Sequence, residues 1–126
     1  MRSSRFAVLT LLVFVISLCG CDAAATKTAA GITGGNPYRG ASSISKYGCG
    51  SCHTIPGING AHGMVGPSLA GIARRVYVAG VLPNQPLNLM RWIQNPKAVD
   101  EKTAMPNLGV TARDATDIAA YLYSLK

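Results

Sequence analysis

Two thiols and an imidazole lie within five residues of one another, in the stretch CGSCH at residues 49–53. A group of this kind can act as a redox dithiol, as half of a zinc site, or as the attachment point of a haem. The choice among these three chemistries depends on the compartment to which the chain is delivered and on the residues that follow the motif.

The first residues predict export from the cytoplasm. Arg2 and Arg5 precede an uncharged run, FAVLTLLVFVISL at residues 6–18, in the order that is typical of a signal peptide. This run of about 13 residues is shorter than the roughly 20 that a helix needs to cross a bilayer. We therefore expect a cleaved signal over residues 1–20, with a short uncleaved anchor as the alternative.

A lipid anchor is expected where this signal ends. LCGC at residues 18–21 resembles the bacterial lipobox, in which the final cysteine becomes the acylated first residue of the mature chain. The resemblance implies that Cys21 carries the lipid, and Asp22 resembles a signal that keeps lipoproteins on the inner membrane. We thus expect a protein anchored on the periplasmic side of the bacterial inner membrane. Residues 21–36 have no aromatic residue and no sustained apolar period, which predicts a flexible tether.

Cys49 and Cys52 are the cysteines left for the folded part, because Cys19 lies in the signal and Cys21 is assigned to the lipid. A disulfide between positions three apart closes a very small loop and constrains the unfolded chain little. A zinc site would need two more ligands, and the other histidine of the chain is His62. Haem attachment uses both thiols and the adjacent histidine, so it is the favoured interpretation, with a thiol or zinc protein as the remote alternative.

Haem attachment explains the spacing of the motif. Two cysteines three positions apart on one helical turn can each bond one vinyl group of the same porphyrin edge, and His53 then points its ring at the iron. The haem would also complete the core, because about 90 residues follow the tether, a size at which a protein core alone is marginal. One haem c, bonded to Cys49 and Cys52, is therefore the expected cofactor.

The rest of the chain predicts one all-α domain over residues 37–126, with long loops. Three main helices are expected, at residues 37–47, 87–94 and 112–126, because Pro37, Pro96 and Thr111 mark their ends. A short helix is also expected after Ser68. The glycine-rich stretch GINGAHGMVG predicts a surface loop between the motif and that short helix.

The order of the motifs resembles that of the class I c-type cytochromes. CGSCH is followed by GPSL at residues 66–69, by LMRWIQNPK ahead of TAMP, and by a terminal IAAYL. Within this family, AGVLPNQPLNLMRWIQNPKAV and MPNLG resemble the cytochrome c domain that is fused to subunit II of certain bacterial haem-copper oxidases. The sequence has no counterpart of the copper-binding domain of those subunits, so the resemblance implies a free-standing, lipid-anchored relative with the small class I fold wrapped around one haem.

The resemblance also implies roles for residues near the motif. The carbonyl oxygen of Pro67 is expected to accept a hydrogen bond from the ring of His53, which would be the proximal iron ligand. Arg74 and Arg75 are each expected either to pair with a haem propionate or to be solvated surface charges. Trp92 is expected to pack against the distal haem face or simply within the core.

Three methionines compete for the sixth coordination position of the iron. Met105 is expected to hold it, because it lies in a loop before the final helix and precedes Pro106, as the distal methionine of the family does. Met64 and Met90 are expected to be packing residues. His62 is expected to be solvated. In this family the first and last helices cross closely. Gly40, Ala41 and Tyr121 occupy the positions of that crossing in this chain.

An iron with histidine and methionine on its two faces has no open coordination site, so we expect one-electron transfer and no enzymatic activity.

Two of the twelve Lys and Arg residues lie in the signal, which leaves ten against five acidic residues and a net charge of +5. This excess is expected to steer a monomeric carrier onto the acidic surface of a respiratory partner. That partner is a terminal cytochrome c oxidase in the leading interpretation and a periplasmic dehydrogenase in the alternative. A nucleic-acid partner is not expected for an exported lipoprotein.

Overall fold

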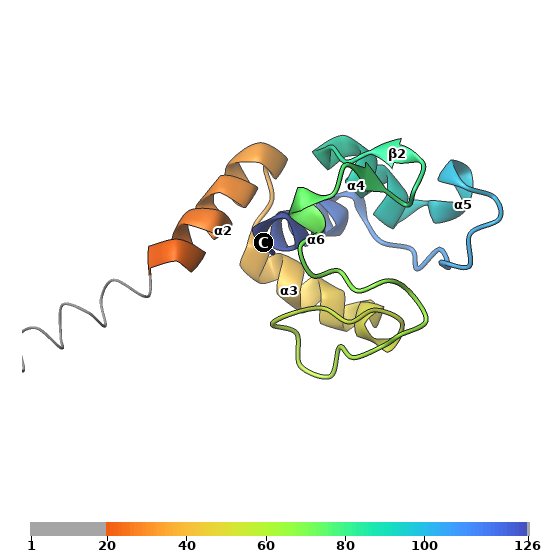
Figure 1. Cartoon of the computed structure of the whole chain (residues 1–126), viewed down its shortest axis with the longest axis horizontal. Coiled ribbons are helices and arrows are strands. Elements are labelled where there is room, and N and C mark those ends of the chain that lie inside the picture. The colour runs from red at the N-terminus through yellow and green to blue at the C-terminus, as the bar shows by residue number, and fades with distance from the viewer. Residues whose placement is uncertain (1–19, 126) are drawn as a thin grey trace, which may run out of the picture.

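The structure of the protein is a computed structural model that describes residues 20–125, without the side chains of residues 20 and 21. Residues 1–19 of the predicted signal peptide, and the side chain of Cys21 on which acylation was predicted, thus lie outside the described residues. Figure 1 shows helices joined by long loops, which confirms the all-α prediction. The elements are α2 (Gly20–Thr33), α3 (Pro37–Lys46), η1 (Cys49–Ser51), η2 (Ile72–Arg74), β1 (Tyr77–Val78), β2 (Leu82–Pro83), α4 (Pro86–Gln94), α5 (Pro96–Val99) and α6 (Ala112–Ser124).

The three main helices predicted from the sequence are α3, α4 and α6, and α3 and α6 cross at the centre of the molecule. The side chain of Asn36 accepts a hydrogen bond from the Arg39 N–H at the start of α3, and Thr111 accepts one from Asp114 at the start of α6. These caps satisfy backbone donors that a helix leaves free in its first turn. The core between the helices is formed by buried aliphatic side chains, among them Ile44, Leu89, Ile93, Ala115, Ile118, Ala119 and Leu122.

Gly40 makes the close approach of α3 and α6 possible. A Cβ atom at this position would lie 2.0 Å from the carbonyl oxygen of Asp117 and 3.0 Å from the Cβ of Tyr121. No side chain fits in that space, so the two backbones meet directly. The structure therefore agrees with the close helix crossing that was expected at Gly40.

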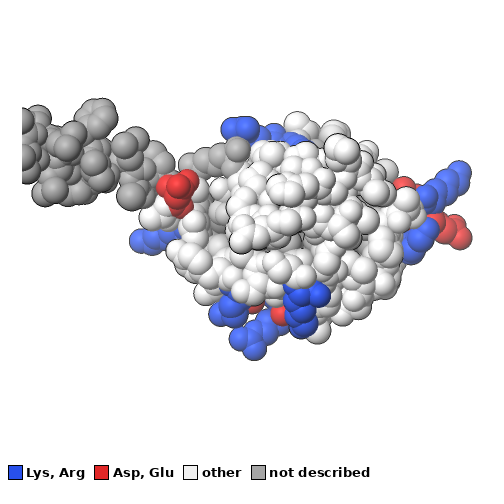
Figure 2. All heavy atoms as spheres, turned by 90° about the horizontal axis from the view of Figure 1, so that it is seen from below, with Lys and Arg blue, Asp and Glu red and all other residues white. Residues whose placement is uncertain are grey.

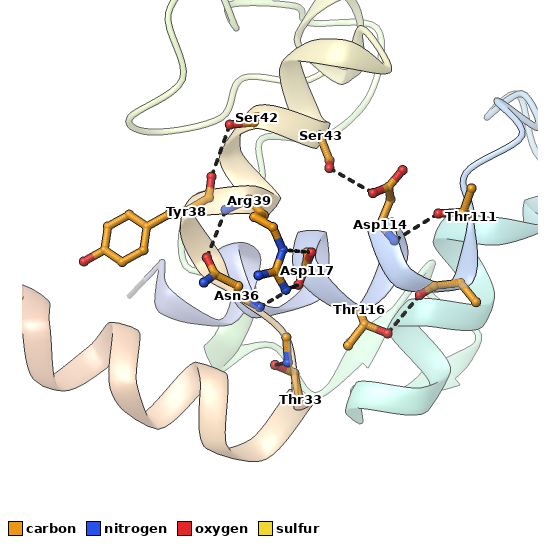
Figure 3. Close-up of polar contacts among 12 residues, drawn as sticks. Thr33, Asn36, Tyr38, Arg39, Ser42, Ser43, Thr111, Asp114, Thr116 and Asp117 are labelled. Atoms are coloured by element: carbon orange, nitrogen blue, oxygen red, sulfur yellow. Dashed lines mark hydrogen bonds and ion pairs between the residues drawn. The ribbon is translucent and has the colours of Figure 1, made fainter.

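Asp117 lies on α6 where this helix crosses α3, and it hydrogen-bonds to residues at the start of α3 (Figure 3). The residue is 2% exposed, and its carboxylate accepts two hydrogen bonds from Arg39, from Nε at 2.7 Å and from Nη2 at 2.9 Å. It also accepts the Asn36 N–H at 2.6 Å. The hydrogen bonds from Arg39 are the main cause that lowers the pKa of Asp117 below its ordinary value. Burial raises this pKa, but the hydrogen bond from the Asn36 amide also lowers it, and the net shift is downward.

We expect this carboxylate to make the fold sensitive to acid. A group whose folded pKa is depressed stabilises the protein above its unfolded pKa, near 3.9 for Asp, and loses that effect as the pH falls through the folded pKa. Asp117→Asn should lower the melting temperature at pH 7 and flatten its decline below about pH 4. Thermal unfolding followed by circular dichroism from pH 7 to pH 2 measures both effects. Parallel curves for the two proteins would contradict this account.

The segment at residues 21–36 is not the flexible tether that the sequence predicted. Residues 20–33 form α2, and Ala25 and Ala29 are buried where this helix packs on α6. Alanine has the highest helix propensity, and its small side chain lets two helices approach closely. The sequence interpretation failed here because a segment rich in alanine and threonine shows no strong apolar period even when one side of it is buried.

The joint between α2 and α3 is also fixed against α6. Gly34 has a left-handed backbone (φ 76°) and ends α2 through a hydrogen bond from its N–H to the Ala30 carbonyl at 2.8 Å. A Cβ atom at Gly35 would lie 2.2 Å from the Thr116 carbonyl oxygen. Asn36, the next residue, is held by the Asp117 carboxylate. α2 therefore leaves the domain in a defined direction (Figure 1).

Substitution of a buried alanine of α2 by glutamate should detach this helix from α6. Ala29 is 1% exposed, whereas Ala24 is exposed on the same helix. Ala29→Glu is expected to destabilise the protein by about 1–3 kcal/mol because it buries a charge without a partner. Hydrogen exchange followed by mass spectrometry should show faster exchange throughout α2 in Ala29→Glu and little change in Ala24→Glu. Equal exchange in the two variants would mean that α2 is not docked.

The remaining elements lie between the motif and α6. The helix expected after Ser68 is reduced to η2, because Gly71 adopts a left-handed backbone (φ 62°) and ends any regular helix there. β1 and β2 form a short antiparallel pair in which Val78 faces Leu82. Asn95 ends α4 as predicted, and its side chain then caps α5. Within residues 20–125, no helix has the length and hydropathy that would be needed to cross a membrane.

Candidate functional site

The two cysteines of the motif lie on one tight turn directly after α3. η1 begins at Cys49, whose carbonyl oxygen accepts the N–H groups of Cys52 at 3.3 Å and of His53 at 3.0 Å. Both thiols are unpaired and half-buried. Burial is the main cause that raises the pKa of the Cys49 thiol. A redox dithiol works through a thiolate of lowered pKa, so this environment does not favour that chemistry.

The ring of His53 is fixed by the loop that follows the motif. Its Nδ1 lies 2.7 Å from the carbonyl oxygen of Pro67, which is the contact that the family resemblance implied. A carbonyl can only accept, so Nδ1 carries the proton and Nε2 is left as the free, basic nitrogen. A histidine held in this way is prepared to bind a metal ion through Nε2.

Backbone hydrogen bonds hold this loop on both sides of the His53 contact. The Gly66 N–H donates to the Cys52 carbonyl at 2.8 Å, and the Leu69 N–H donates to the Thr54 carbonyl at 2.9 Å. The position of Pro67 relative to His53 is therefore set by two backbone segments, residues 52–54 and 66–69, which are joined on both sides of the contact. In Figure 1 the loop forms the lower edge of the molecule.

Two glycines allow the loop to lie directly on the motif. A Cβ atom at Gly66 would come within 2.4 Å of Cε1 of His53, and one at Gly63 within 2.4 Å of the Ser51 carbonyl oxygen. The sequence pattern predicted no more than a surface loop from these glycines. Their spacing from CGSCH carries no local signal, because the contact forms when the loop returns across the motif.

The loop is also tied to α6. The hydroxyl of Tyr121 donates to the carbonyl oxygen of Pro56 at 2.6 Å. Since Tyr121 lies on α6 beside the crossing with α3, the motif and its loop are held by the same helix pair that forms the core. This second role of Tyr121 was not expected from the sequence.

The methionines and His62 differ in their surroundings. Met105 is half-buried in the loop between α5 and α6, which forms the right-hand edge in Figure 1. Met90 packs against the core, with its Sδ 3.7 Å from the Thr116 hydroxyl, as expected of a packing residue. Met64 is 89% exposed, so it is not the packing residue that the sequence predicted. His62 is exposed in the same glycine-rich loop, as expected.

The two arginines after the GPSL stretch have different neighbours. Arg75 donates through Nη2 to the carbonyl oxygens of Ser68 and Ala70, and thereby braces the loop after Pro67. The guanidinium of Arg74 is exposed and has no hydrogen-bond partner within residues 20–125. Arg74 is thus the arginine that remains available for a negatively charged group. Trp92 is half-buried and packs against the core.

The donor set fits a c-type haem better than it fits zinc. Among residues 20–125, no three His, Cys, Asp or Glu side chains form a group that could hold a metal ion. Zinc would need four such ligands or three with an open position. Two unpaired thiols on one turn, followed by a histidine whose Nε2 is free, are instead the types of group that can attach a haem and bind its iron.

The comparison with known families agrees with this donor set. The sequence model of the family Cytochrome c matches residues 38–126. The chain belongs to the cytochrome c family. Membership implies covalently bound haem c and makes the protein an electron-transfer haem protein, as the resemblance of the motifs predicted.

A relative of this cytochrome is a cytochrome c oxidase subunit 2 from Alkalihalophilus pseudofirmus, which is 33% identical over 79 residues. The match covers 62% of this chain and 22% of the relative, so the cytochrome spans less than a quarter of that subunit. No solved structure matches the chain significantly. The similarity to this subunit confirms the resemblance that the stretches around LMRWIQNPK and MPNLG suggested.

Proposed function

We propose that this cytochrome carries one haem c, bonded to Cys49 and Cys52, and acts as a one-electron carrier rather than as an enzyme. The observation that supports this most is the contact between His53 Nδ1 and the Pro67 carbonyl oxygen at 2.7 Å, beside two unpaired thiols on one turn. In the proposal His53 is the proximal iron ligand and Met105 the distal one. A bound haem c supplies a one-electron couple between ferric and ferrous iron.

The residues of the chain tune and protect this couple. The carbonyl of Pro67 keeps the proton on Nδ1 and fixes the orientation of the ring, so Nε2 would be the nitrogen that holds the metal. A methionine sulfur at the other position favours the ferrous state and raises the reduction potential relative to a second histidine. With His53 and Met105 both bound to the iron, no position would remain at which a substrate could bind it.

Charge and exposed apolar side chains support docking to a redox partner. Figure 2 views the molecule from below in Figure 1, from the side of the loop that carries Pro67, and the charged side chains lie around the rim of an uncharged centre. Met64 and Val65 in this loop are 89% and 82% exposed. Basic groups steer the approach of an acidic partner, and apolar groups make close contact once it has arrived. The relative's name supports a cytochrome c oxidase as that partner.

The proposal includes a lipid anchor on Cys21, on the periplasmic side of the inner membrane. α2 starts at the predicted cleavage site and spans about 21 Å at 1.5 Å per residue. Because α2 is packed on α6, such an anchor would hold the haem domain at the membrane by a rigid segment and not by a swinging tether. The carrier would then reach partners that lie in the same membrane.

Electron delivery to a purified bacterial cytochrome c oxidase in proteoliposomes tests this function. The reduced, full-length cytochrome should be oxidised rapidly, and the rate should fall as the salt concentration rises, because salt screens the docking charges. Cys21→Ser should leave the visible spectrum unchanged but lose binding to the liposomes. Rapid reduction by a periplasmic dehydrogenase without electron transfer to the oxidase would overturn the donor role and favour the alternative.

A further inference from the structure

Lys97 makes an unusual contact for an exposed lysine, because its ammonium group reaches back to the loop that follows its own helix. Nζ donates to the carbonyl oxygen of Thr103 at 2.5 Å and to that of Glu101 at 3.1 Å. Lys97 lies in α5, whose start is capped by the side chain of Asn95. The group that donates these hydrogen bonds is therefore anchored on a regular element.

The same loop residue that accepts from Lys97 also holds Met105. The hydroxyl of Thr103 accepts the N–H of Met105 at 3.1 Å. The N–H of Thr103 in turn donates to the carbonyl of Asp100 at 3.1 Å, which closes a turn directly after α5. A continuous series of hydrogen bonds thus connects Lys97 in α5, through Thr103, to Met105.

Other support for this loop is sparse. No helix or strand is present between α5 and α6. Within residues 100–111, Val110 alone is buried. Hydrogen bonds to a charged donor are the strong ones, so the ammonium of Lys97 contributes more than a neutral side chain would. Loss of this donor would leave the carbonyls of Glu101 and Thr103 to water and let the loop open.

We propose that Lys97 is a positioning residue for Met105, which keeps the methionine in place and so protects the sixth coordination position from other ligands. This inference rests on the proposed role of Met105 as the distal ligand. Lys97 acts on the iron through its two hydrogen bonds to the loop, and not through a long-range electrostatic effect of its charge. A general electrostatic effect would be shared by Lys102, which carries the same charge in the same loop.

Lys102 provides a matched control for this distinction. Its backbone N–H donates to the Asp100 carboxylate at 3.0 Å, but its ammonium group has no hydrogen-bond partner within residues 20–125. Lys97→Leu and Lys102→Leu remove the same charge, and only the first removes the two hydrogen bonds to the loop. Lys97→Arg keeps both the charge and the donors.

The test titrates the oxidised, haem-loaded variants with imidazole and follows the visible spectrum. Lys97→Leu should bind imidazole about three- to tenfold more tightly than the wild type, the effect expected from losing a charged hydrogen bond near the surface. Lys102→Leu should stay within about twofold and Lys97→Arg should restore most of the wild-type value. Amide exchange at residues 101–109 should be faster in Lys97→Leu alone. Equal shifts in both leucine variants, or no shift in either, would overturn the proposal.

Met105→Ala in the same titration separates this inference from the proposed function. If Met105→Ala binds imidazole much more tightly than the wild type while Lys97→Leu does not, Met105 is the ligand and the positioning role of Lys97 is wrong. If Met105→Ala leaves the imidazole affinity unchanged, the distal ligand is another group, and both the ligand assignment and this inference are overturned.

Discussion

Met105→Ala should remove the weak far-red absorption band that cytochromes c owe to the bond between iron and methionine sulfur, and should lower the reduction potential. The physical reason is that a soft sulfur ligand favours ferrous iron, and alanine offers no atom to replace it. The position left open should bind carbon monoxide in the reduced protein. Because a lower potential makes the haem harder to reduce, reduction of the variant by its electron donor should slow, even though the docking charges are unchanged.

Met64→Leu and Met90→Leu are the controls for this variant. Met64 is 89% exposed and Met90 packs against the core, so neither change should alter the far-red band. Met90→Leu is nearly volume-conserving and should cost less than about 1.5 kcal/mol of stability. Loss of the band in one of these variants, with Met105→Ala unaffected, would assign the ligand to a different methionine.

Gly40→Ala should destabilise the protein strongly, although it adds only a single methyl group. The added Cβ would lie 2.0 Å from a backbone carbonyl oxygen of α6, and backbone cannot move aside as a flexible side chain can. Separating α3 from α6 also weakens the hydrogen bonds of Asp117, so we expect a loss of about 3 kcal/mol or more. Denaturant unfolding of the haem-loaded protein measures this loss.

Gly31→Ala is the matched control for the same substitution. Gly31 also lies within a helix, and a Cβ atom there meets no atom within 4 Å. Because alanine is a better helix former than glycine, this variant should be unchanged or more stable by up to about 1 kcal/mol. Similar unfolding curves for the two variants would show that α3 and α6 are not as close as the structure places them.

The parts of the fold that the sequence predicted are those with local signals. Pro37 and Thr111 mark the starts of α3 and α6 because capping depends on residues within one turn. α2 was missed because its burial depends on Ala25 and Ala29 meeting α6, a surface nearly a hundred residues away in the sequence. The role of Asp117 was missed for the same reason, since its partner Arg39 lies 78 residues away.

The candidate site divides in a similar way. Cys49, Cys52 and His53 are found by their spacing alone, and Pro67 and Met105 follow from the order of motifs in a known family. The contacts that hold them in place have no such pattern: the glycines under the loop, the hydroxyl of Tyr121 and the ammonium of Lys97 act only after the chain has folded back on itself. The side chains to which the chemistry is assigned could thus be proposed from the sequence, and most of those that contact and position them could not.

Mass spectrometry of the full-length protein, expressed in a bacterium that attaches haem c, tests directly whether a haem is bonded to Cys49 and Cys52. We expect one haem per chain, carried on the peptide that contains residues 49–53, with both Cys49 and Cys52 protected from alkylation under denaturing conditions. The haem should stay on the chain through acid-acetone extraction, because thioether bonds hold it. A purified chain whose two thiols alkylate freely, and from which any haem extracts cleanly, would contradict the account.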